Sequence, residues 1–138
     1  MLIVAVYFEL FSTVLVDGVV DHKEIVGISD QTSRTLLVIT PWGVSIEDPS
    51  LITLFQSQGL NLTVNETLDR QMQSLGYSQI LYLGGIRVSS NDPVNGLSQG
   101  ETLSYFVTRD DFNKLIINGS VSYEVDRFQK ATIREVHD

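Results

Sequence analysis

The chain has 138 residues, of which 43% are hydrophobic and 19% are charged, a composition typical of one folded domain with its own core. It contains no cysteine, so disulfides, zinc–thiolate sites, iron–sulfur clusters and thiol catalysis are excluded. The net charge of −8, from 17 acidic against 9 basic residues, argues against general binding of DNA or RNA, and of duplex nucleic acid in particular, because binding to a phosphate backbone draws its affinity from lysines and arginines. A small anionic ligand held by one or two arginines is compatible with this charge.

The N-terminal run LIVAVYF (2–8) has strand length and predicts a strand that is covered on both faces. The first twenty residues lack the positive start of a signal peptide. They are also interrupted by Glu9, Asp17 and Gly18, so they do not form the uninterrupted apolar stretch of a membrane span. We therefore expect a soluble, non-exported, cytoplasmic protein with no membrane partner.

A hairpin and two further strands are predicted next. Asp17-Gly18 lies between two β-branched runs and predicts a hairpin turn, because both central positions of such a turn favour positive φ. The runs KEIVGI (23–28) and RTLLVIT (34–40) predict two more strands, joined by the polar turn SDQTS (29–33). Pro41-Trp42-Gly43 then marks a turn or a strand end.

A first helix is predicted to begin at Asp48, the capping residue, with Pro49 at its first position. Gly59 marks its end. Its buried stripe is expected to be Leu51, Ile52, Leu54 and Phe55.

A second helix is predicted from Thr63, which forms a capping box with Glu66. Gly76 supplies its C-terminal stop. Four apolar residues share one face of this helix and are expected to be buried: Val64, Leu68, Met72 and Leu75.

The run QILYLGGIRV (79–88) predicts a buried strand in which Gly84-Gly85 marks a bulge or a close backbone approach. The polar loop at 89–100 is long enough to be functional or mobile. The run ETLSYFVT (101–108) predicts another strand.

Thr108 is expected to cap a short helix with the buried stripe Phe112, Leu115 and Ile116. Asn118-Gly119 then turns the chain into a strand at 120–125, and residues 131–136 predict an edge strand. We predict a single domain over 1–138 with an α+β fold. Its expected architecture is a mixed, largely antiparallel sheet of five to seven strands with two or three short helices on one face.

No catalytic residue is predicted. A Ser-His-Asp triad needs a histidine, and only His22 and His137 are present, without a Gly-x-Ser-x-Gly elbow. The candidates for acid–base catalysis are Glu101, Asp110 and Asp111. Asp110 and Asp111 lie in the first turn of a predicted helix, where the helix dipole alone explains acidic residues.

No metal and no cofactor are predicted either. Asp17, Asp21, His22 and Glu24 are close together in the sequence and carry ligands for a hard cation. Their spacing matches no EF-hand loop, and polar residues beside a turn are usually solvated.

The one candidate ligand-binding motif is formed by Gly84, Gly85 and Arg87. The glycines let backbone N–H groups approach a ligand closely, and the arginine can pair with an anion. The alternative is a bulge with a structural arginine at the end of the strand, because the motif is not a Gly-x-Gly-x-x-Gly fingerprint.

The C-terminal third carries a pattern of loop, short acidic helix and strand: LSQGETLS from Leu97, a spacer, and RDDFNKLIINGSVSYEV from Arg109. With PSLITLFQSQG upstream (49–59), it resembles the small viral anti-CRISPR ring nucleases. The matching stretches cover about a third of the chain.

This resemblance implies binding of a cyclic nucleotide messenger. Glu47-Asp48-Pro49 occupies the place of the catalytic histidine of the family, and Gly96 and Gln99 stand where its loop has arginine and glutamate. Inherited cleavage of cyclic oligoadenylate is therefore not expected.

The function expected from the sequence is that of a non-catalytic binding or accessory domain. A homo-oligomer is expected, because exposed strand edges and a strongly apolar β half favour a symmetric partner. The alternative is a protein that binds, and less readily cleaves, a cyclic nucleotide messenger, as viral anti-defence proteins do.

Overall fold

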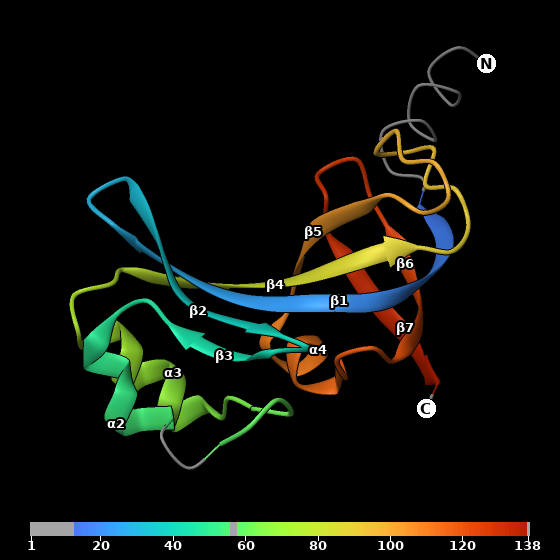
Figure 1. The fold of residues 1–138 in the computed structure, drawn as a ribbon. Helices are drawn as coiled ribbons and strands as arrows, with labels where there is room; N and C mark the ends of the chain where they lie inside the picture. Colours follow the sequence, from blue (N-terminus) through green and yellow to red (C-terminus); the bar gives the residue numbers. More distant parts are fainter. Residues whose placement is uncertain (1–12, 56–57, 138) are drawn as a thin grey trace.

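The computed structural model describes residues 13–55 and 58–137. Within them, a seven-stranded antiparallel sheet is accompanied by short helices, which confirms the predicted α+β class (Figure 1). The strand predicted at 2–8 lies outside the described residues. The strands are β1 (Val14–Ser29), β2 (Thr32–Thr40), β3 (Gly43–Ile46), β4 (Gln79–Val88), β5 (Thr102–Val107), β6 (Ser120–Val125) and β7 (Ala131–His137). The helices are η1 (Pro49–Leu51), α2 (Ile52–Phe55), α3 (Glu66–Gln73) and α4 (Arg109–Lys114), and none of them is long and apolar enough to cross a membrane.

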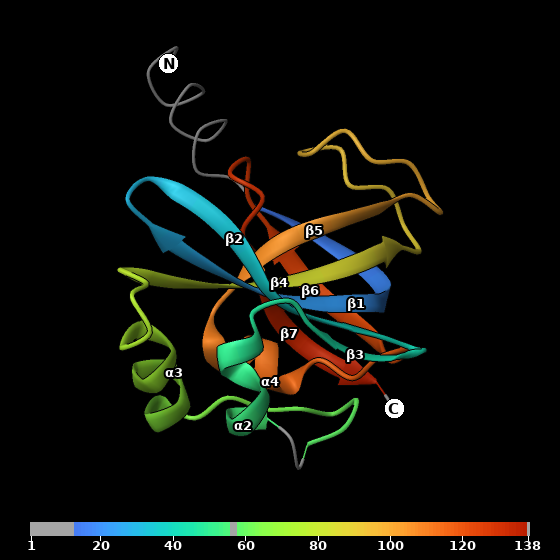
Figure 2. The ribbon, with the colours of Figure 1, turned by 60° about the vertical axis from the view of Figure 1, so that its left-hand side comes forward.

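Strand β1 organises the sheet. One of its edges pairs with β4 along residues 18–28, and the other edge pairs first with β6, along 14–19, and then with β2, along 23–29. Figures 1 and 2 show β1 as a long, curved ribbon that passes through both halves of the molecule. β1 therefore belongs to two sheet regions at once.

Five of the strands form a partly open barrel in the order β1-β4-β5-β7-β6. Antiparallel ladders join β1 to β4, β4 to β5, β6 to β7 and β6 to β1. The barrel closes where β5 meets the residue just before β7, at one isolated parallel bridge between Phe106 and Lys130. With α4 between its third and fourth strands, this order and connectivity are those of an OB-type barrel. β2, β3, η1, α2 and α3 form an insertion between its first two strands.

The barrel interior is filled by alternate side chains of the strands. Tyr105 and Tyr123 meet edge to face inside it, with ring centroids 5.2 Å apart. The Tyr105 hydroxyl donates to the buried carboxylate of Asp92 at 2.7 Å, and that carboxylate also accepts from Asn95. The 89–100 loop is thus anchored to the barrel interior by Asp92.

The predicted hairpin at Asp17-Gly18 is wrong, because both residues lie inside the continuous strand β1. A Cβ on Gly18 would lie 2.4 Å from the Ile86 side chain and 2.9 Å from the Arg87 carbonyl oxygen. The glycine therefore serves close packing of β4 on β1, not a turn. The turn between the next two predicted strands is confirmed at Asp30-Gln31, with φ of 48° and 67°.

The first predicted helix begins as expected. The Asp48 side chain accepts from the Ser50 N–H, and Pro49 follows the cap. The predicted buried stripe is correct for Leu51 and Phe55, but Ile52 is 51% exposed. The 3-10 turn η1 precedes α2 and rotates the face that a continuous α-helix would bury.

The second helix has a different cap from the predicted one. Asn65 accepts from the Leu68 N–H at 2.8 Å, whereas Thr63 lies two residues before the cap. The capping box is therefore wrong, and the helix begins at Glu66. Met72 is buried as expected, but Leu75 lies beyond the last helical residue and is 42% exposed.

The third helix is capped by Thr108, as predicted, through the Asp111 N–H at 3.1 Å. Phe112 and Leu115 are buried, but Ile116 is 38% exposed. The helix ends at Lys114, so the chain has left the helical path before it reaches Ile116. The predicted turn at Asn118 is confirmed by its φ of 68°.

Candidate functional site

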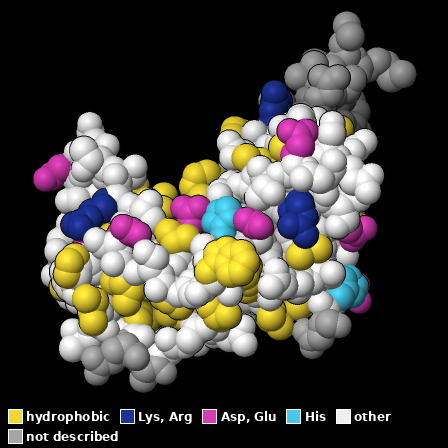
Figure 3. Space-filling view, viewed as in Figure 1, with side chains coloured by type: hydrophobic (Ala, Val, Ile, Leu, Met, Phe, Trp, Pro, Cys, Tyr) yellow, Lys and Arg dark blue, Asp and Glu magenta, His cyan; other side chains and the backbone are white. Residues whose placement is uncertain are grey.

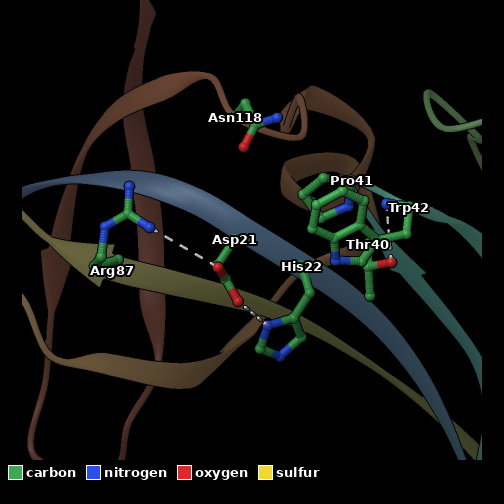
Figure 4. Close-up of a pocket in the computed structure, with 7 residues that line it drawn as sticks. All are labelled: Asp21, His22, Thr40, Pro41, Trp42, Arg87 and Asn118. Carbon is green, nitrogen blue, oxygen red and sulfur yellow. Dashed lines mark hydrogen bonds and ion pairs between the residues drawn. The ribbon is translucent and has the colours of Figure 1, made fainter.

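A pocket of about 530 Å³ opens where the pairing of β1 passes from β6 to β2. We call it the notch pocket (Figure 4). Its lining residues come from four parts of the chain: Asp21 and His22 on β1, Thr40, Pro41 and Trp42 at the β2–β3 turn, Arg87 on β4, and Asn118 in the turn before β6.

A β-bulge explains why two consecutive residues of β1 reach this pocket. Val20 pairs with Ile86 and His22 pairs with Gly85, so Asp21 is an extra residue in the ladder. In a regular strand, neighbouring side chains point to opposite faces. The bulge interrupts this alternation and lets both Asp21 and His22 line the pocket.

The bulge or close backbone approach predicted at Gly84-Gly85 is not found: β4 is continuous there, and the groups closest to the two glycines are side chains. The bulge lies on the neighbouring strand β1. A Cβ on Gly85 would lie 2.0 Å from the His22 ring, and a Cβ on Gly84 would lie 2.6 Å from the Leu115 side chain. Both glycines therefore leave room for side chains of this protein.

His22 is held between two carboxylates. Its Nδ1 lies 3.0 Å from Asp21 Oδ2, and its Nε2 lies 2.9 Å from Glu24 Oε1. The hydrogen bond with Glu24 is the largest of the effects that raise the pKa of His22, and burial opposes it. The same hydrogen bond lowers the pKa of Glu24. The cluster therefore favours an imidazolium that donates both N–H groups.

Ser104 on β5 completes a group with the distances of a Ser-His-Asp triad. Its Oγ lies 3.0 Å from His22 Nε2. A triad needs that nitrogen free of its proton, so that it can accept the proton of the serine. Glu24 contacts the same nitrogen and stabilises its proton, so the arrangement does not provide a general base.

Arg87 is the predicted site residue that lines the pocket as a charged group. Its Nη1 lies 4.0 Å from Asp21 Oδ1, and half of its side chain is exposed. Figure 4 shows Arg87 and Trp42 at opposite ends of the pocket, with Asp21 and His22 between them. Trp42 is 94% exposed, so its ring is available to a ligand.

Three of the other candidate residues, Asp17, Glu101 and Asp111, have structural partners, whereas Asp110 is exposed. The Asp17 carboxylate accepts from the Ser122 hydroxyl, and Glu101 accepts from the Ser98 N–H. Asp111 is buried, accepts from the Ile133 N–H and contacts Lys114. In the described part of the chain, no group of three or more His, Asp or Glu side chains is placed to hold a metal ion.

Sequence reasoning identified Arg87 but missed Trp42 and Asn118 as pocket residues. A tryptophan between proline and glycine in a turn was a signal for an exposed aromatic side chain. Asn118 carried no such signal, because its place beside Asp21 follows from the pairing of β6 with β1.

No protein-family model matches the chain, and a search of curated proteins and solved structures gives no significant match.

Proposed function

We propose that the chain is a non-catalytic binding domain whose notch pocket takes a nucleotide. The observation that carries this proposal is an exposed indole at one end of a pocket whose other end holds a half-exposed guanidinium. A nucleotide offers a flat ring for the first group and a phosphate for the second.

Trp42 is suited to the base. A ligand that covers an exposed tryptophan ring removes a large apolar surface from water, which favours binding. Stacking a base on an aromatic side chain contributes about 1–3 kcal/mol to the binding free energy. Asn118 is exposed on the turn that borders the pocket, where its amide offers both a donor and an acceptor.

Arg87 is suited to the phosphate, because guanidinium–phosphate hydrogen bonds are charge-assisted. Asp21 limits the charge that the pocket accepts, since its carboxylate lies between Arg87 and His22. A ligand with one phosphate per ring therefore fits better than a triphosphate. A cyclic nucleotide messenger, which the sequence resemblance implies, belongs to this class.

The size of the pocket and the type of barrel support the same proposal. Small-molecule sites commonly have volumes of about 300–1,000 Å³, and the notch pocket lies within this range. OB-type barrels bind oligonucleotides and oligosaccharides on the face of their second and third strands, which correspond here to β4 and β5. This support is an analogy at the level of the fold.

The homo-oligomer expected from the sequence remains part of the proposal. β3 lies at the end of the sheet and pairs with β2 alone among the described strands. A second copy can pair with such an edge. Light scattering coupled to size exclusion tests this part separately, and a monomeric mass at high concentration would contradict it.

The proposal predicts quenching of tryptophan fluorescence by nucleotides. Trp42 is the single tryptophan of the chain, so the signal reports on the pocket alone. We expect adenosine monophosphate and cyclic dinucleotides to quench it with saturation, and calorimetry to give matching dissociation constants.

Arg87→Ala should weaken this binding by about 1.5–3 kcal/mol and leave the melting temperature nearly unchanged. Arg70→Ala is the matched control, because Arg70 is an exposed arginine on α3 outside the pocket. The proposal fails if neither quenching nor heat is detected for the wild type, or if both variants bind as it does.

A further inference from the structure

We infer that His22 controls the binding of an anion in the notch pocket, because its protonated ring keeps the Asp21 carboxylate away from Arg87. Loss of this proton releases Asp21 to Arg87 and lowers the affinity of the pocket for a phosphate. This inference rests on the proposed function and adds regulation by pH to it.

The Asp21 carboxylate has a charged partner on each side. Its Oδ2 lies 3.0 Å from His22 Nδ1, whereas its Oδ1 lies 4.0 Å from Arg87 Nη1. Figure 4 shows the carboxylate between these two side chains. No other ion pair joins Arg87 to a described residue. Since Asp21 is bound more closely by His22, the Arg87 guanidinium keeps its donors for a ligand.

The surroundings of the His22 ring fix its position. β4 lies against the ring at Gly85, where a Cβ would be 2.0 Å from it. The ring Nε2 lies 2.9 Å from Glu24 Oε1 and 3.0 Å from Ser104 Oγ on β5. The pocket residues from the β2–β3 turn and from the turn before β6 are uncharged: Thr40, Pro41, Trp42 and Asn118. The carboxylates of Asp21 and Glu24 are therefore the charged groups that hold the ring.

A neutral His22 ring can donate to one of the two carboxylates only, because it has a single N–H group. Glu24 is the more buried of the two, with 23% of its side chain exposed against 43% for Asp21. Leaving a buried carboxylate unpaired costs more than leaving an exposed one unpaired, so we expect the remaining proton to stay on Nε2, next to Glu24. Nδ1 then presents a lone pair to Asp21, and the Asp21 carboxylate turns to Arg87.

The change in net charge acts in the same direction. With His22 protonated, the charges of His22 and Arg87 balance those of Asp21 and Glu24. Without that proton the four groups carry one negative charge, which opposes the binding of a phosphate. Figure 3 shows a histidine between two acidic side chains, with a basic side chain next to one of them, on one face of the molecule. The His22 side chain is 19% exposed, so its proton can exchange with solvent.

The test measures the binding of cyclic di-adenosine monophosphate from pH 5.5 to 9, by Trp42 fluorescence and by calorimetry. The phosphodiester groups of this ligand keep their charge over this range, whereas a phosphate monoester titrates near pH 6. The hydrogen bond with Glu24 raises the pKa of His22, so the affinity should begin to fall above the ordinary histidine pKa of about 6.5. We expect a decrease of about tenfold by pH 9, because only the protonated form leaves Arg87 to the ligand.

Two variants should have opposite effects on the affinity. His22→Gln should remove the pH dependence and keep the affinity at the low value of the wild type at pH 9. Asp21→Asn should flatten the pH dependence at the high value, because an amide does not compete for Arg87. His137→Gln is the matched control, since the other histidine of the chain lies on β7, outside the pocket, and should leave the pH profile unchanged.

A second measurement needs no variant. If the protonated form binds more tightly, the ligand must raise the pKa of His22 by the same factor, which NMR titration of the ring protons can follow in the wild type. Burial lowers the pKa of the neighbouring Lys23 to about 8, and His22→Gln retains this lysine. A fall in affinity that persists in His22→Gln would therefore assign the pH dependence to Lys23 and overturn the inference.

The remaining outcomes separate the regulation from the proposed function. An affinity that stays constant from pH 5.5 to 9, or a pKa of His22 that the ligand does not change, would overturn the regulation and leave the proposed function intact. Failure of the wild type to bind the cyclic dinucleotide at any pH would overturn both.

Discussion

Lys23 is fully buried next to α4. Its Nζ donates to the Leu115 carbonyl at 3.0 Å and lies 3.5 Å from the Leu62 carbonyl oxygen, and it sits 4.2 Å from the centre of the Phe112 ring. The ion pairs found among the described residues do not include it. Burial lowers its pKa to about 8.

This lowered pKa predicts that stability increases with pH above 8. Between about pH 8 and the ordinary lysine pKa of about 10.4, the unfolded chain binds more protons than the folded one, so the free energy of unfolding rises. Burial raises the pKa values of Tyr82 and Tyr105. The unfolded chain therefore loses tyrosine protons first above about pH 10, and stability falls again.

Urea melts at pH 7, 8, 9 and 10 should show this increase in the wild type. In Lys23→Met the increase should be absent, and the variant should be at least as stable as the wild type at pH 7, because a charge no longer has to be buried. A wild-type stability that stays constant from pH 8 to 10 would contradict the burial of a charged Lys23.

At the scale of elements, the start of α3 gives a direct test of the corrected cap. Asn65→Ala should lower the free energy of unfolding by about 0.5–2 kcal/mol, because the Leu68 N–H loses its acceptor. Thr63→Ala should have little effect, since Thr63 lies outside the helix. Denaturant melts of both variants decide between the two caps, and a larger loss for Thr63→Ala would restore the capping box.

Comparing the predicted with the observed turns and helix caps shows which sequence signals were sufficient to predict local structure. The turns at Asp30-Gln31 and Asn118, and the caps at Asp48 and Thr108, depend on neighbouring residues and were predictable. Asp17-Gly18 has an equally strong local signal for a turn. It was misleading because its glycine is required by the packing of β4 against β1, which local sequence does not reveal.

The candidate site was less predictable for the same reason. Arg87 was identified from its place at a strand end, but Trp42 and Asn118 join it only because β1 exchanges one neighbour for another at its bulge. Asp21 and His22 were recognised as a polar cluster near a presumed turn. Their actual roles depend on Glu24 and Ser104, and Ser104 lies on a different strand.

At the scale of the whole molecule, the acidic surplus predicts that duplex DNA does not bind at physiological salt. Duplex binding needs a wide basic face to displace counterions. The chain has 9 basic residues against 17 acidic ones. Fluorescence anisotropy with a labelled duplex should show no saturable binding, whereas a nanomolar, salt-sensitive dissociation constant would contradict the prediction.

The pairing of one edge of β1 with both β6 and β2 also has a consequence for the order of folding. Its C-terminal half pairs with β2, the next strand along the chain, and this hairpin needs only a short loop to close. Its N-terminal half pairs with β6, which is made much later during synthesis. During synthesis on the ribosome, the C-terminal half of β1 can therefore pair with β2 before β6 has been made. The N-terminal half of β1 pairs only after β6 has been made, so the barrel forms last.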